Sequence, residues 1–286
     1  MRLLAPAALL IVIAWALPTR VGADDDNKVL DKAVAAFKAG QYKAAAELAD
    51  KAAKQDLKSP GGPLLVGLAR LQLRDNEAAA KALTDAITRD PKLATAYDRR
   101  GDANLKLGKF TEAVADFDKF LTLTDGPKDA ANHWRRGIAL YYAGKYDEGR
   151  KQFELHRTVN AEDVENSAWH YLCNSRATNT KKARAELIPV TKDARVPMKE
   201  VLELFAGKIK PEDVLKAPEA AKLMGEQLVE AQFYANLYVA LYYESEGDEK
   251  KARAYLTDAV EKYKIGDYMW DVGNAQLIVL KKKQSN

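Results

Sequence analysis

Small and bulky apolar positions recur along this chain with a period close to 34 residues. Gly40, Arg74 and Gly108 stand 34 residues apart, Gly144 follows 36 residues later, and Gly247 lies 103 residues further on. Five places after each of these five positions stands a small residue: Ala45, Ala79, Ala113, Gly149 and Ala252. Nine places after each of them stands an apolar residue, which is small in the first case and bulky in the others: Ala49, Leu83, Phe117, Phe153 and Leu256. Such a repeat predicts stacked pairs of antiparallel helices.

The pattern is typical of tetratricopeptide repeats, and its breakers divide the first half of the chain into four helical pairs. The breakers are Ser59-Pro60-Gly61-Gly62-Pro63, Asp90-Pro91 and Asp125-Gly126-Pro127. The predicted helices lie near 26–39 and 42–55, 60–74 and 76–89, 94–107 and 110–123, and 130–143 and 146–159. Within a pair, small residues on the first helix let the second approach closely, and we expect Gly67, Gly101 and Gly137 to serve this purpose.

The second half of the chain is less regular. Helices are predicted near 162–178, 180–187, 197–206 and 211–217, with an extended linker from Pro189 to Pro197. Regularity returns with a long helix near 219–246 and a partner near 248–263. A last helix near 267–282 is expected to cover the open apolar face of the final pair, since a terminal repeat needs such a cap.

The predicted fold is therefore an all-α, tetratricopeptide-type helical solenoid with a degenerate middle segment and a C-terminal capping helix. The predicted divisions are a signal peptide at 1–23, four repeats at 24–163, an irregular helical segment at 164–232, and a repeat-like pair with its capping helix at 233–286. The sequence does not decide whether the middle segment separates two arms of the solenoid or folds back to form a pocket.

The first 23 residues have the pattern of a secretory signal. Arg2 precedes an apolar stretch from Leu3 to Leu17, and Val21-Gly22-Ala23 is a small-residue cleavage site. The apolar stretch is shorter than the roughly 20 residues that a membrane helix needs, so cleavage after Ala23 is favoured over an uncleaved anchor. The expected location is periplasmic or secreted.

Charge and cysteine content narrow the choice of function. The formal net charge is +4, with 45 basic and 41 acidic residues spread along the chain, which does not form the basic footprint of a nucleic-acid-binding protein. Cys173 is the only cysteine, so the exported chain has no internal disulfide, and a buried, inert thiol is favoured. His170 and Cys173 are three residues apart, but no second pair completes a zinc site. We expect neither a metal nor a cofactor.

The first helices of tetratricopeptide repeats line a concave groove through their positions 2, 5, 9, 12 and 13. In the fourth repeat these positions include Trp134, Ile138, Tyr141 and Tyr142. Tryptophan and tyrosine are typical of binding hot spots. Leu64 and Leu68 of the second repeat would extend the apolar lining. The alternative is that each of these residues packs as core, which is favoured for any one aromatic residue but not for all together.

The equivalent positions of the third repeat are polar. They include Asp98, Asp102, Leu105 and Lys106. Asp98 and Asp102 share one helix face, where they would form a solvated charged surface, contact a ligand, or act as the acid pair of a hydrolase. The groove as a whole suits an extended or helical peptide. We therefore expect a non-enzymatic scaffold that binds a protein or peptide partner, and we keep a hydrolase and a self-assembling structural protein, such as a homodimer, as alternatives.

Three segments resemble the bacterial NlpI-type tetratricopeptide envelope proteins. They are Arg136 to Gly144, Glu165 to Leu172, and Phe233 through Gly247-Asp248 to Val260. The resemblance covers most of the chain after the signal. It implies an adaptor of the cell envelope, often dimeric, that brings substrates to a protease and scaffolds peptidoglycan hydrolases. Those proteins carry a lipidated cysteine at the signal junction, where this chain has Gly22-Ala23-Asp24.

Overall fold

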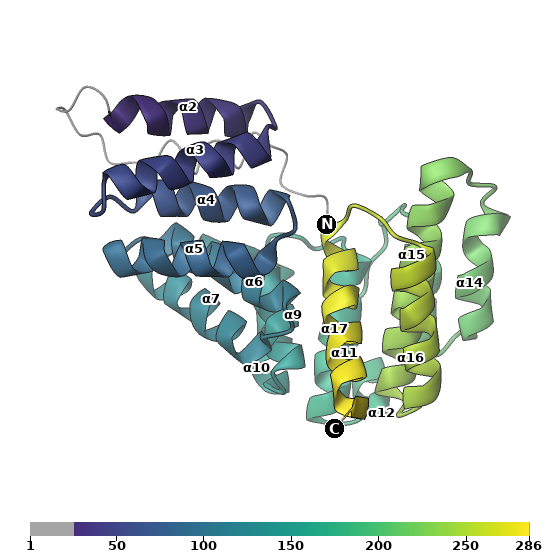
Figure 1. Cartoon of the computed structure of the whole chain (residues 1–286). Helices are drawn as coiled ribbons and strands as arrows, with labels where there is room; N and C mark the ends of the chain where they lie inside the picture. Colours follow the sequence, from purple (N-terminus) through teal and green to yellow (C-terminus); the bar gives the residue numbers. More distant parts are fainter. Residues whose placement is uncertain (1–25, 286) are drawn as a thin grey trace. The chain divides into compact units, whose positions relative to one another are not determined.

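The computed structural model describes residues 26–285, which are helical and contain no strand (Figure 1). The signal predicted at 1–23 lies outside these residues. The helices are, in order, α2 (Asp26–Lys38), α3 (Tyr42–Gln55), α4 (Gly61–Gln72), α5 (Asn76–Arg89), α6 (Ala94–Lys106), α7 (Phe110–Thr124), α8 (Pro127–Asn132), α9 (Trp134–Tyr142), α10 (Tyr146–His156), α11 (Val164–Ala177), α12 (Thr180–Ala185), α13 (Met198–Phe205), α14 (Pro211–Ala220), α15 (Gly225–Ser245), α16 (Glu249–Thr257), the π-helix η1 (Asp258–Lys262) and α17 (Tyr268–Ser285).

The chain divides into two compact units, and the division lies between Asp125 and Gly126. Unit 1 holds α2 to α7, which form three antiparallel pairs that stack in sequence order, from purple to blue in Figure 1. Unit 2 holds α8 to α17. Asp125 ends α7 in the left-handed conformation, and Pro127 opens α8 in its first turn, where a missing N–H is tolerated. The fourth predicted pair therefore groups with the C-terminal part of the chain.

The 34-residue rhythm marks left-handed turns between the two helices of each pair. Gly40, Gly108, Gly144 and Gly247 have φ angles of 74°, 73°, 76° and 82°. Arg74 occupies the same place in the second repeat with φ 57°, a conformation that side chains disfavour and glycine accepts. These marks therefore reflect a backbone requirement of the turn.

The predicted role of the first-helix glycines is confirmed. A Cβ atom built on Gly67 would lie 2.5 Å from Leu83, on Gly101 2.6 Å from Phe117, and on Gly137 2.6 Å from Phe153. The three partner side chains are fully buried, and each lies nine residues after the left-handed residue of the turn before it. The helices of each pair thus touch where one has no side chain and the other has a large one.

The fourth pair differs from the single helix predicted near 130–143. The structure has two helices there, α8 and α9, with a break at His133. The His133 side chain accepts a hydrogen bond from the backbone N–H of Arg136 at 3.3 Å and so caps the start of α9. Neither glycine nor proline marks this break, which is why the pattern did not predict it.

Two further departures lie in the C-terminal half. The long helix predicted to start near 219 begins at Gly225, because Lys222 adopts a positive φ of 55° and ends α14. The last turn of the partner helix is the π-helix η1. The indole N–H of Trp270 donates to the backbone carbonyl of Val260 in η1 at 3.1 Å, which satisfies one carbonyl of this wider turn.

Helix α17 covers the final pair, as predicted for a capping helix. Its Met269, Val272 and Ala275 are fully buried. A Cβ atom on Gly273 would lie 3.4 Å from Val260 and 3.5 Å from Leu237, so α17 contacts both helices of the pair. The predicted all-α fold of antiparallel helical pairs with a C-terminal capping helix is thereby confirmed. Within the described part of the chain, every helix is too short or too polar to cross a bilayer.

Candidate partner-binding faces

The aromatic residues predicted to line the groove of the fourth repeat lie on α9, at different depths. Ile138 is fully buried and Tyr141 is 2% exposed, whereas Trp134 and Tyr142 are half-buried. The rings of Tyr141 and Tyr142 lie 5.6 and 5.8 Å from the ring of Trp169 on α11, both in edge contact. Helix α9 therefore packs on α11 through Tyr141 and Tyr142, and of the four predicted residues Trp134 and Tyr142 remain partly accessible.

Helix α17 lies on this same face of α9. The rings of Trp134 and Tyr268 are 5.0 Å apart at an interplanar angle of 85°. The Tyr142 hydroxyl donates to Oε1 of Gln276 at 2.8 Å. The amide of Gln276 in turn donates to Glu244 of α15. Ring and hydrogen-bond contacts therefore hold α17 to α9 along two turns of helix.

Glu244 joins both tyrosines of this face into one polar network. The Tyr141 hydroxyl donates to its carboxylate at 2.9 Å. Burial, and then the charge of Glu244, raises the pKa of Tyr141 and of Tyr142 well above the ordinary value. Both hydroxyls thus keep their protons and remain hydrogen-bond donors.

The expectation of an open aromatic groove on the fourth repeat needs correction for this conformation. Ile138 and Tyr141 are core residues: both side chains are buried, and the Tyr141 ring contacts Trp169 of α11. Trp134 and Tyr142 do make contacts of the expected kind, but their occupant is α17 of the same chain. The sequence predicted that α17 covers the last pair of helices, but it did not predict the contact of α17 with α9.

In unit 1 the predicted apolar lining is also core. Leu64 is 3% exposed, Leu68 is 2% exposed, and Leu105 of α6 is fully buried. Leu64 and Leu68 belong to one cluster with residues of α2, α3 and α5, against which the half-buried Leu30 and Val34 of α2 pack. The accessible apolar surface at groove positions of unit 1 is therefore on α2, at Leu30 and Val34.

The carboxylates of α6 form ion pairs. An oxygen of Asp98 lies 3.4 Å from Nε of Arg99, and an oxygen of Asp102 lies 3.3 Å from Nζ of Lys106. All four side chains are between 7% and 13% exposed. The two carboxylates are thus mostly buried and ion-paired, rather than part of a solvated charged surface, which was one of the three expectations for Asp98 and Asp102.

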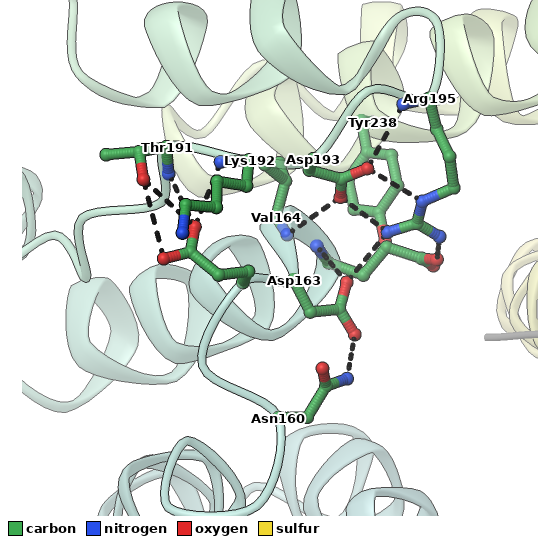
Figure 2. Close-up of polar contacts among 10 residues, drawn as sticks. Asn160, Asp163, Val164, Thr191, Lys192, Asp193, Arg195 and Tyr238 are labelled. Carbon is green, nitrogen blue, oxygen red and sulfur yellow. Dashed lines mark hydrogen bonds and ion pairs between the residues drawn. The ribbon is translucent and has the colours of Figure 1, made fainter.

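A dense polar cluster lies in unit 2, where the extended linker meets the start of α11 (Figure 2). Arg195 bonds three buried carboxylates, those of Asp163 at 2.8 Å, Glu165 at 2.6 Å and Asp193 at 2.6 Å. Glu165 is fully buried and also accepts a hydrogen bond from the Tyr238 hydroxyl of α15 at 2.9 Å. We call these residues the Arg195 cluster: Asp163, Glu165, Asp193, Arg195 and Tyr238.

The Arg195 cluster fixes the linker on α11. Asp193 accepts the backbone N–H of Val164 at 3.2 Å, and Glu162 accepts the backbone N–H groups of Thr191 and Lys192 at 2.8 and 2.9 Å. Burial, and then the charge of Glu165, raises the pKa of Asp163. The cluster binds one segment of the chain to another, and the sequence analysis missed it, although Asp163 stands where a helix cap is expected.

The histidine and cysteine residues fit a structural role. Cys173 is fully buried, and burial raises the pKa of its thiol far above the ordinary value, which makes it unreactive. Burial also lowers the pKa of His170, whose Nε2 lies 3.4 Å from Glu154. Among residues 26–285, no three side chains of His, Cys, Asp or Glu are grouped closely enough to hold a metal ion.

Comparison with known proteins identifies the repeats. Residues 30–94 and 64–130 match the family model of the tetratricopeptide repeat. A stretch of 100 residues is 31% identical to a protein SGT1 homolog of Bos taurus and covers 35% of this chain and 29% of that protein. A stretch of 81 residues is 37% identical to the protein SGT1 homolog of Oryza sativa subsp. japonica and covers 28% of this chain and 22% of that protein. The matches thus span less than a third of either relative.

Solved structures share the fold over a longer part of the chain. A tetratricopeptide repeat protein from Parabacteroides merdae superposes with a TM-score of 0.58 at 14% identity, over 90% of this chain and 100% of that one. A MamA double mutant superposes with a TM-score of 0.52 at 17% identity, over 58% of this chain and 92% of that one. Residues 30–130 therefore carry tetratricopeptide repeats, and the fold of the chain is a tetratricopeptide-type helical solenoid.

Proposed function

We propose that this chain is a non-catalytic adaptor that holds a peptide or a helix of a partner protein against its repeats. The observation that carries the proposal is the contact between α9 and α17 in unit 2. There a repeat helix holds another helix through aromatic rings and side-chain hydrogen bonds, and grooves between helices also serve as binding sites for helical partners. The tetratricopeptide repeats of unit 1 support the same function.

In unit 1 we assign partner binding to the groove face of α2 and α6. Leu30 and Val34 supply half-buried apolar surface, and Thr95 of α6 is half-buried as well. The ion pairs of Asp98 with Arg99 and of Asp102 with Lys106 supply fixed charges on α6. A partner segment with apolar residues and a few charges is complementary to these positions.

A photoreactive amino acid placed in the chain tests this assignment. We expect discrete crosslinks to a partner protein from positions Leu30, Val34 and Thr95 in cells that make the full chain. The same amino acid at Lys51, Lys81 and Lys119, which are exposed on the second helices, serves as the control and should give none. Mass spectrometry of the adducts identifies the partner segment.

The crosslinked segment, made as a synthetic peptide, should bind the purified chain. Replacing Leu30 and Val34 together with alanine should weaken that binding by about tenfold, because interface residues of this kind carry a large share of binding energy. Lys51→Ala is the matched surface control. Equal crosslinking from both sets of positions, or equal affinity for the variant and the control, would contradict the assignment.

We also propose that the adaptor works outside the cytoplasm, because residues 1–23 have the pattern of a secretory signal. The resemblance to NlpI-type envelope proteins supports a finer proposal. In it, the partners are an envelope protease or peptidoglycan hydrolases, and the chain acts as a homodimer. The identity of the crosslinked partner tests the first part, and light scattering on the purified chain tests the second.

Export has a direct test. We expect the chain recovered from a periplasmic or secreted fraction to begin at Asp24, as read by N-terminal sequencing. Leu10→Arg places a charge in the apolar stretch and should retain the chain inside the cell, whereas Asn27→Arg adds the same charge after the junction and should not. Recovery of the Leu10→Arg variant in the exported fraction at the native level would refute the signal.

A further inference from the structure

Helix α17 makes two kinds of contact on two sides. It packs on α15, α16 and η1, and its Met269, Val272 and Ala275 are completely buried, as in a core helix. Toward α9 it presents Tyr268 and Gln276, which contact Trp134 and Tyr142. The α9 side therefore differs in chemistry from the rest of the contacts of α17.

The contact between α9 and α17 has the composition of a protein–protein interface. It consists of tyrosine and tryptophan rings with hydrogen bonds between side chains, and Trp134 and Tyr142 stay half-buried. Such interfaces are rich in aromatic residues and polar contacts. An equivalent helix from another protein would find the same partners on α9.

We propose that the α9 face, formed by Trp134, Tyr142 and the adjoining Glu244, is a binding site for a partner helix, and that α17 is its built-in competitor. The partner helix would carry an aromatic residue and, eight positions later, a glutamine, as α17 carries Tyr268 and Gln276. Residues eight apart lie on one face of a helix. A free partner helix can therefore bind only to molecules in which α17 has left the α9 face.

The hydrogen bonds of the network explain why a helix of this chemistry is required. Gln276 both accepts from Tyr142 and donates to Glu244. If α17 moved away and nothing replaced it, the half-buried Tyr142 and Glu244 would lose their hydrogen bonds to Gln276. A helix with the same two side chains restores the contacts, so exchange of one helix for the other is much easier than emptying the site.

The position of α17 in the chain permits such an exchange. It follows a loop in which Gly266 is exposed and has open space around it. The proposal rests on the adaptor function, since it names the kind of partner segment that unit 2 accepts. Its test uses α17 itself as the probe and leaves α2 and α6 untouched, so either proposal can fail while the other holds.

The test is a reciprocal substitution at Gln276. A fluorescent synthetic peptide with the sequence from Asp267 to Gln284 is titrated with the full chain, and binding is followed by anisotropy. Gln276→Ala in the chain weakens α17 as a competitor but leaves the α9 face intact, so the affinity for the peptide should rise about tenfold. The same substitution in the peptide should lower the affinity for the chain by about tenfold.

Two controls separate this result from general loosening of the fold. Tyr255→Phe, on the opposite helix α16, removes a hydroxyl from unit 2 and should leave peptide affinity unchanged. Amide hydrogen exchange in α17 of the native chain should speed up when the peptide is bound, while exchange in α11 should not. The proposal is overturned if the folded Gln276→Ala chain binds the peptide no better than the native chain, or if the substituted peptide binds as well as the native one.

Discussion

Replacing Arg195 with methionine should lower the free energy of unfolding of unit 2 by about 3 kcal/mol at neutral pH. The guanidinium is the cation bonded to Asp163, Glu165 and Asp193, whose side chains are at most 5% exposed. Without it, buried carboxylates face one another, and such uncompensated charges cost several kcal/mol. Because the Arg195 side chain is itself 42% exposed, water can replace part of its contacts, so we expect the lower end of that range.

Urea unfolding followed by circular dichroism measures this loss, and Lys192→Met is the matched control. Lys192 lies on the same linker and is exposed, and the group that it donates to Glu162 is its backbone N–H, so replacing its side chain should cost less than about 0.5 kcal/mol. Glu165→Gln in the Arg195→Met background should recover part of the stability, because it removes one buried charge and keeps an acceptor for Tyr238. Equal losses in Arg195→Met and Lys192→Met would contradict the prediction.

The deficit of the Arg195→Met chain should shrink between pH 7 and pH 5. In the native chain, burial and Glu165 raise the pKa of Asp163 while Arg195 opposes the rise, so removing Arg195 raises it further. A carboxyl group whose folded pKa is raised destabilises the fold when it is ionised, and falling pH relieves this. Burial acts to raise the pKa of Asp193, but the hydrogen bonds and charge of Arg195 hold it below the ordinary value. The lowered pKa of Asp193 therefore adds stability only in the chain that keeps Arg195, and this added stability is lost as the pH falls and Asp193 is protonated.

The repeated parts of the fold could be predicted because their cause is local and recurs. A left-handed turn favours glycine, as at Gly40, Gly108, Gly144 and Gly247, and the same preference appears each time the pair of helices is repeated. Close approach within a pair requires a missing side chain at a fixed distance from a large one. Both demands leave a trace in the sequence at constant spacing. The break at His133 leaves no such trace, since it depends on one histidine cap.

The candidate sites could be predicted only in part, because they depend on contacts between distant residues. Trp134 and Tyr142 stood out by their type and position, but the helix that covers them begins more than a hundred residues later at Tyr268. The sequence of α17 indicates that this helix is apolar enough to be buried, but it does not indicate which surface the helix packs against. The Arg195 cluster has the same origin, since Glu165 and Tyr238 are 73 residues apart in the sequence.

Replacing Gly101 with valine should lower the free energy of unfolding of unit 1 by about 3 kcal/mol. The first added atom alone would lie 2.6 Å from the Phe117 ring, which is fully buried and has no free space to move into. The two helices cannot separate to make room without strain, because Arg100 on α6 holds Asp116 on α7 through two hydrogen bonds of 2.6 and 2.9 Å. The added side chain therefore strains a pair of helices that hydrogen bonds hold together next to the point of contact.

A double-substitution cycle separates this steric cost from a general effect of valine in a helix. Phe117→Leu alone should cost about 1 kcal/mol by leaving a cavity, but in the Gly101→Val chain the smaller partner should return about 1 kcal/mol. Gly266→Val, at an exposed glycine with no atom within 4 Å of the added Cβ, should change the stability little. If the two substitutions on α6 and α7 were simply additive, Gly101 would not serve close approach, and the 34-residue recurrence of glycine at this position would need another cause.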